Sequence, residues 1–212
     1  MARRNVIVDP TVPYGICSRL INREWFELPM EEVWGLMCRH LYFMHHAFDI
    51  EIHLFVLMIN HFHLMATAPE AKLSEAMAFF LRETSRELVK SSGRINMSYG
   101  GRFFRTRIGS HHYYLNAYKY FYRNPIEAGL VKRAEDYRWS TLRGLLGFDQ
   151  LIIPVVEDLT LFADVGGTLD WINCRPNVED RESVRRALRR GDFHFPKDRT
   201  TRGEHRLESR LL

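Results

Sequence analysis

The chain has 212 residues, a formal net charge of +4 and a sequence pI of about 9.0. Its 46% hydrophobic and 13% aromatic content excludes a disordered protein and favours one packed domain with an appendage. The longest apolar run, residues 52–68, is interrupted by Asn60 and three histidines, which makes it a poor membrane span. No apolar segment follows the basic start, and the three cysteines are widely spaced. We therefore expect a soluble cytoplasmic protein without a secretory signal.

The hydrophobic pattern and the turn residues predict seven elements before Pro125. In chain order they are a strand at 14–23, a helix from about 30 to 46, strands at 50–58 and 61–67, a helix at about 73–91, a strand at 102–108 and a helix from Ser110 to 123 or 124. The order of the first six is the split βαβ, or ferredoxin-like, arrangement. We expect an α+β fold in which two helices cover one face of an antiparallel sheet.

The rest of the chain divides at Gly147. Residues 127–146 are expected to form a further helical stretch that completes a domain of residues 1–146. Residues 147–212 then form a C-terminal extension, irregular over 149–180 and helical over 180–190, with Val184 and Leu188 facing inward. Residues 192–212 are charged and contain little apolar surface, so we expect a loosely ordered tail.

Two histidines lie two residues apart on a predicted strand. Because alternate residues of a strand share a face, His61 and His63 would lie roughly 6.5–7 Å apart on one side. Two imidazoles at that spacing can bind one metal ion. The pair alone is weak support, since most such pairs are surface or hydrogen-bonded histidines, and a structural pair stays open.

A basic stripe follows the second predicted helix and continues into the next strand. Its cations, which we expect to contact DNA, are Arg82, Arg86, Lys90, Arg94, Arg102, Arg105 and Arg107. Aromatic residues lie among them, and this combination is typical of single-stranded nucleic acid binding. The alternative is a solvated helix face partly neutralised by Glu83 and Glu87. A second basic cluster, residues 185–190, fits a further phosphate contact and a solubilising surface equally well.

The helix after Ser110 is rich in tyrosine, which is usually a sign of a core or interface helix. Tyr120 lies four residues before Asn124, so a phenol and a carboxamide project from the same helix face. An amide oxygen can bind a divalent ion, and an activated phenolate is a competent nucleophile.

Two segments carry a family resemblance. Residues 56–64 (VLMINHFHL) resemble the HUH signature of single-tyrosine transposases, with Ile59 where that family usually has proline. Residues 120–131 (YFYRNPIEAGLV), followed by Tyr137 and Trp139-Ser140, are similar to the second signature of the REP-associated tyrosine transposases. The resemblance covers roughly residues 14–146.

This resemblance implies a metal-dependent enzyme that nicks and joins single-stranded DNA. His61, His63 and Asn124 would hold Mg²⁺ or Mn²⁺, although imidazoles would suit zinc as well. Tyr120 would attack the phosphate of a hairpin-forming strand and leave a 5′-phosphotyrosine and a free 3′-hydroxyl. No membrane is implied, and a homodimer is left open.

Three other functions also fit the sequence. The chain could be a catalytically silent DNA-binding regulator from the same family, or an RNA-binding ferredoxin-like module, which the missing RNP-type aromatic signature disfavours. It could also be an unrelated metallohydrolase, although Met65 stands where a third alternating histidine would extend the pair.

Overall fold

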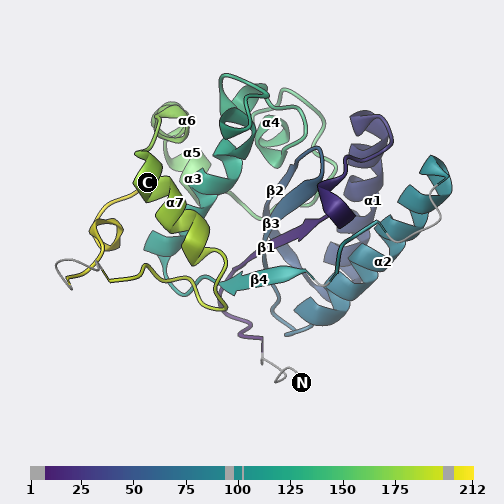
Figure 1. Cartoon of the computed structure of the whole chain (residues 1–212), viewed down its shortest axis with the longest axis horizontal. Helices are drawn as coiled ribbons and strands as arrows, with labels where there is room; N and C mark the ends of the chain where they lie inside the picture. Colours follow the sequence, from purple (N-terminus) through teal and green to yellow (C-terminus); the bar gives the residue numbers. More distant parts are fainter. Residues whose placement is uncertain (1–7, 94–97, 102, 198–202) are drawn as a thin grey trace.

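The sheet at the centre of the molecule has four antiparallel strands in the order β2-β3-β1-β4 (Figure 1). The strands are β1 (Tyr14–Arg19), β2 (Glu51–Leu57), β3 (His61–Thr67) and β4 (Phe104–Arg107). The computed structural model describes residues 8–93, 98–101, 103–197 and 203–212. β1 ends earlier than predicted because the backbone turns through positive φ at Asn22 and Arg23, in the short 3-10 helix η1 (Ile21–Arg23).

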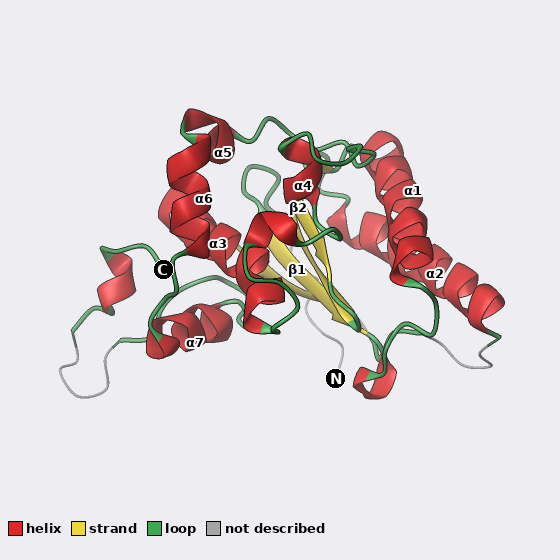
Figure 2. Ribbon diagram, turned by 90° about the horizontal axis from the view of Figure 1, so that it is seen from above, coloured by secondary structure: helices red, strands yellow, loops and turns green. Residues whose placement is uncertain are grey.

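Two long helices, α1 (Met30–Phe48) and α2 (Leu73–Ser92), cover one face of the sheet (Figure 1, Figure 2). The apolar residues of α1 recur at helical spacing and are buried against Phe62 and Leu64 of β3. The order of the elements and the position of both helices on one face confirm the predicted α+β, ferredoxin-like fold.

The third helix, α3 (His111–Glu127), packs on the other face of the sheet against β2 and β3. Ser110 caps it by accepting a hydrogen bond from the Tyr113 backbone N–H. Since side chains alternate along β3, His61, His63 and Met65 point to the face that α3 occupies, away from α1 and α2.

The prediction that this helix ends at residue 123 or 124, before Pro125, is wrong. The helix continues to Glu127, with Pro125 in its last turn and without the hydrogen bond that the missing N–H would have donated. The carbonyl of Phe121, which would have accepted that bond, lies 3.4 Å from the side-chain nitrogen of Asn124.

The predicted helical stretch over 127–146 is also wrong. The chain turns at Gly129, whose φ of +71° is left-handed and favours glycine. It then forms the single turn η2 (Ala134–Asp136) and the short helix α4 (Thr141–Leu145). This segment is joined to the sheet by hydrogen bonds, since Leu57 donates its N–H to the Trp139 carbonyl.

The C-terminal extension contains more regular structure than predicted. Residues 149–180, expected to be irregular, include α5 (Leu159–Ala163), α6 (Val165–Asn173) and the start of α7 (Val178–Ala187). Their polar residues serve as helix caps: Asp158, Asp164 and Asn177 each accept a backbone N–H at a helix start. Val184 is buried and Leu188 is half-buried, as predicted.

The described part of the C-terminal tail makes more contacts than a loosely ordered segment. Phe193, Phe195, Leu207 and Leu212 are buried in the same cluster as α3, and η3 (Arg206–Glu208) lies within this segment. The division of the chain at residue 146 stays a prediction. Among the described helices, none is both long and apolar enough to cross a membrane.

Candidate active site

One cavity, of about 460 Å³, opens on the α3 side of the sheet, where β1, β3, α3 and α7 meet. Its lining includes all four residues that the sequence predicted for the metal and the nucleophile: His61, His63, Tyr120 and Asn124. A single chain therefore brings together two motifs that are distant in the sequence.

The floor of the cavity is formed by neighbouring strands. In the register of β1 and β3, His61 lies opposite Arg19 and His63 lies opposite Cys17. Gly15 continues this face of β1, and a Cβ built on it would lie 3.2 Å from both Phe121 and Leu188. The absence of a side chain at Gly15 thus allows α3 and the end of α7 to approach the sheet closely.

The two histidines are held in a form that can bind a metal ion. Their ring centroids lie 4.9 Å apart, and His63 stacks on Phe121 at 4.9 Å. Nδ1 of His61 lies 2.7 Å from the side-chain oxygen of Asn60, which fixes the ring and leaves Nε2 available. Burial lowers the pKa of His61 to about 4, and burial also places the pKa of His63 well below its usual value, so both rings are neutral at neutral pH.

His63 is unusual because both of its ring nitrogens are buried without a hydrogen-bond partner among the described residues. Buried polar nitrogens of this kind are normally paired, because an unpaired one costs about 1–3 kcal/mol. A ligand in the cavity would give them a partner, and imidazole nitrogens are suited to a divalent metal ion.

The donor set around the histidines is limited. Within the described ranges, no three His, Cys, Asp or Glu side chains are placed to share an ion. The carboxylate on the cavity, Glu127, is paired with Arg123 at 2.9 Å and with Arg181 at 3.4 Å. An uncharged side-chain oxygen that lines this cavity beside the histidines is the amide oxygen of Asn124.

Tyr120 differs from three of the other four tyrosines of α3, whose hydroxyls form hydrogen bonds. Tyr114, like Tyr120, forms none through its hydroxyl within the described residues, but it does not line this cavity. Tyr113 donates to Glu208, Tyr118 donates to Asp158 and the Tyr122 hydroxyl pairs with Thr141. The Tyr120 hydroxyl forms no hydrogen bond with the described part of the chain, although its ring is only 8% exposed. Its oxygen is therefore uncommitted, and the residue lies on the cavity wall.

Burial and nearby cations act on Tyr120 in opposite directions. Burial raises the pKa of its phenol, because the phenolate is less well solvated inside the protein. The positive charges of Arg181, Arg185 and Arg189 lower it. These three arginines also line the cavity. Arg185 and Arg189 belong to the second basic cluster, for which the sequence left a phosphate contact open, whereas Arg181 and Arg19 were not singled out.

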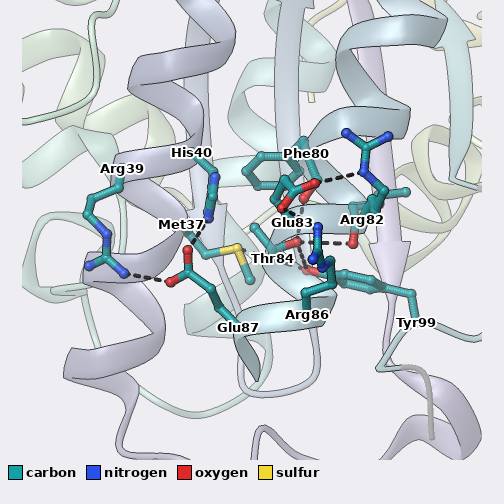
Figure 3. Close-up of polar contacts among 11 residues, drawn as sticks. Met37, Arg39, His40, Phe80, Arg82, Glu83, Thr84, Arg86, Glu87 and Tyr99 are labelled. Carbon is teal, nitrogen blue, oxygen red and sulfur yellow. Dashed lines mark hydrogen bonds and ion pairs between the residues drawn. The ribbon is translucent and has the colours of Figure 1, made fainter. Parts of the chain in front are cut away.

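The predicted basic stripe on α2 lies elsewhere. α2 covers the face of the sheet opposite the cavity, so Arg82, Arg86 and Lys90 do not meet the histidines (Figure 1). Glu83 pairs with Arg82 at 2.7 Å and with Arg86 at 3.4 Å, and the three side chains are drawn in Figure 3. Lys90 is exposed. DNA contact by this stripe stays a prediction, and any such contact would be remote from Tyr120.

The two other cations of the stripe that the structure describes, Arg105 and Arg107, also lie outside the cavity. Arg107 binds Asp9 at 2.6 Å, and Arg105 donates to Ser74 at 3.0 Å. Arg94 and Arg102 fall outside the residues that the structure describes.

Comparisons with known proteins show the fold. No protein-family model matches the sequence, and no curated protein matches it. A solved structure that does match is described as a REP-associated tyrosine transposase bound to a REP hairpin. The TM-score is 0.57 at 20% sequence identity, and the match covers 74% of this chain and 93% of the other. At this identity the two chains share an architecture.

Proposed function

We propose that this protein nicks and rejoins single-stranded DNA through a covalent bond between Tyr120 and a 5′-phosphate. The observation that carries the proposal is the shared cavity. An uncommitted phenol, two neutral imidazoles and an amide come from two separate motifs and line one space. The likeness of the fold to that of a hairpin-bound tyrosine transposase supports the same function.

A divalent metal ion fits the residues present. We propose that His61, His63 and Asn124 hold Mg²⁺ or Mn²⁺, since the unpaired nitrogens of His63 require a partner and the pKa values of both histidines favour the neutral ring. When bound, such an ion polarises a phosphate and stabilises the charge that develops on it.

The chain's own chemistry is a transesterification at phosphorus. The Tyr120 hydroxyl loses its proton, and its oxygen attacks the scissile phosphorus in line. The bond from phosphorus to the tyrosine oxygen forms as the bond to the 3′ oxygen breaks, and that oxygen takes up a proton. The products are a 5′-phosphotyrosine and a free 3′-hydroxyl. Attack by a 3′-hydroxyl in the reverse direction rejoins the strand without an external energy source.

The cavity favours an unpaired strand as the substrate. Phe104, on the cavity wall, is 38% exposed and offers a ring on which a base can stack. Arg19 on the same wall places a positive charge beside the histidines. A single strand carries both exposed bases and phosphates, and a hairpin beside it would mark the site of cleavage. A homodimer is not needed to complete the site.

A covalent-adduct assay tests the proposed function. The protein is incubated with hairpin-bearing single-stranded DNA and Mg²⁺ or Mn²⁺, and adducts are resolved on a denaturing gel. We expect an adduct with the wild-type protein and none with Tyr120→Phe. Tyr113→Phe is the matched control, because it also removes one hydroxyl from α3, away from the cavity. A wild-type protein that binds these strands without forming an adduct would instead be a DNA-binding regulator.

A further inference from the structure

Three arginines from the C-terminal extension form one wall of the cavity. Arg181 and Arg185 lie one turn apart on α7, and Arg189 follows one turn later, just past the end of the helix. Residues four apart share a helix face, so the three guanidinium groups form a row. Their neighbours Arg186 and Arg190 do not line the cavity.

The row is held against the sheet by both side chains and backbone. Leu188 packs over Gly15 of β1, and its carbonyl accepts a hydrogen bond of 2.7 Å from the Thr106 hydroxyl of β4. The chain then runs beside β4, where Arg107 donates its N–H to Gly191 and Phe193 donates to Arg107, both at 2.8 Å. The base of the row is therefore fixed relative to β1 and β4.

The charges on the cavity wall are unbalanced. Its described lining includes four arginines and one carboxylate, Glu127, which already pairs with Arg123 and Arg181. Arg185 pairs with Glu182 of its own helix at 2.9 Å, a partner that is 44% exposed. Within the described part of the chain, no carboxylate pairs with the Arg189 guanidinium. A polyanion entering the cavity would meet a net positive wall.

We propose that Arg185 and Arg189, with Arg181, bind the backbone phosphates of the DNA strand on which Tyr120 acts. This inference rests on the proposed function and extends it, because it assigns the strand-holding surface to the C-terminal extension. Arginine is suited to this task, since its planar group can donate two hydrogen bonds to one phosphate. The catalytic cavity is then built from both predicted parts of the chain.

The neighbouring arginines provide a matched control. Arg185→Ala with Arg189→Ala and Arg186→Ala with Arg190→Ala each remove two positive charges from the same short segment. In each pair one residue lies on the helix and one lies just past it, and only the first pair lines the cavity. Both double variants are made in the Tyr120→Phe protein, so that binding is measured without any covalent step.

Binding of a hairpin-bearing single strand is followed by fluorescence anisotropy over a range of salt concentrations. Each phosphate contact on a single strand contributes about 0.7 to the slope of log K against log salt, so loss of two contacts should reduce it by about 1.4. We expect this reduction, and about tenfold weaker binding at low salt, for the cavity pair. The control pair should change both quantities much less.

A lysine double variant is the control for a loss of folding. Arg185→Lys with Arg189→Lys keeps the charges and should restore most of the salt slope. Equal losses for the cavity pair and the control pair, or an unchanged slope for the cavity pair, would overturn the inference. Because binding is measured without cleavage, a selective loss at the cavity pair supports the phosphate-binding surface even if no adduct forms. An absent adduct would count against the proposed enzyme alone.

Discussion

Asn124 donates its side-chain N–H to the backbone carbonyl of Tyr120 at 2.9 Å, one turn earlier on α3. The bond holds the amide nitrogen against its own helix and leaves the amide oxygen free to bind a metal ion. The same bond fixes the amide beside the turn that carries the phenol. The predicted nucleophile and the predicted third metal ligand are thus positioned by one helical turn.

Removal of the amide should therefore impair metal-dependent chemistry more than folding. We expect Asn124→Ala to slow adduct formation by about 10²-fold, which is typical of losing one stabilising group at a charged transition state. Asn124→Asp retains an oxygen donor and should recover part of the rate. The rate of adduct formation is measured against Mn²⁺ concentration. Equal rates for wild type and Asn124→Ala at every concentration would remove Asn124 from the metal site.

The stripe on α2 makes a different prediction, because it lies across the sheet from the cavity. We expect Arg86→Ala with Lys90→Ala to weaken DNA binding and to flatten its salt dependence. The rate of adduct formation at saturating DNA should stay unchanged, since neither side chain lines the cavity. An unchanged salt slope would show that this surface is a solvated helix face and does not contact DNA.

Arg107, predicted from the sequence to contact DNA, should instead contribute to folding stability. It donates two hydrogen bonds to Asp9, and hydrogen bonds from Thr11 and Arg107 lower the pKa of the Asp9 carboxyl to about 2. An acid with a lowered pKa stabilises the fold above its unfolded pKa, near 3.9, and this contribution is lost as the pH falls towards 2.

We therefore expect Asp9→Asn to lower the urea midpoint at pH 7 and to have little effect near pH 2. Urea unfolding at several pH values measures this difference. Arg107→Ala should show the same trend. If Arg107→Ala left the urea midpoint unchanged and weakened DNA binding, the original prediction for this residue would be correct.

The fold could be predicted from the sequence because its signals are local. Val33, Met37 and Leu41 recur at helical spacing and are buried, and β3 alternates between the two faces of the sheet. The predicted helix boundaries were wrong where a single residue sets the backbone conformation. Pro125 is tolerated in a last turn, and Gly129 adopts a left-handed conformation that breaks a helical pattern.

The candidate site could be predicted only in part. His61, His63, Tyr120 and Asn124 lie in short motifs whose spacing can be read directly. Arg185 and Arg186 belong to one basic cluster in the sequence. Which of them lines the cavity depends on what the apolar face of α7 packs against, here Leu188 over Gly15. That contact joins residues from opposite ends of the chain, and no local pattern encodes it.

The most direct test of the account is to locate the covalent bond. The adduct formed with hairpin-bearing single-stranded DNA is digested with protease and nuclease, and the modified peptide is sequenced by mass spectrometry. We predict one nucleotide attached through its 5′-phosphate to Tyr120, with a free 3′-hydroxyl on the released strand. Attachment to another residue, or a 3′-phosphate linkage, would contradict the proposed chemistry.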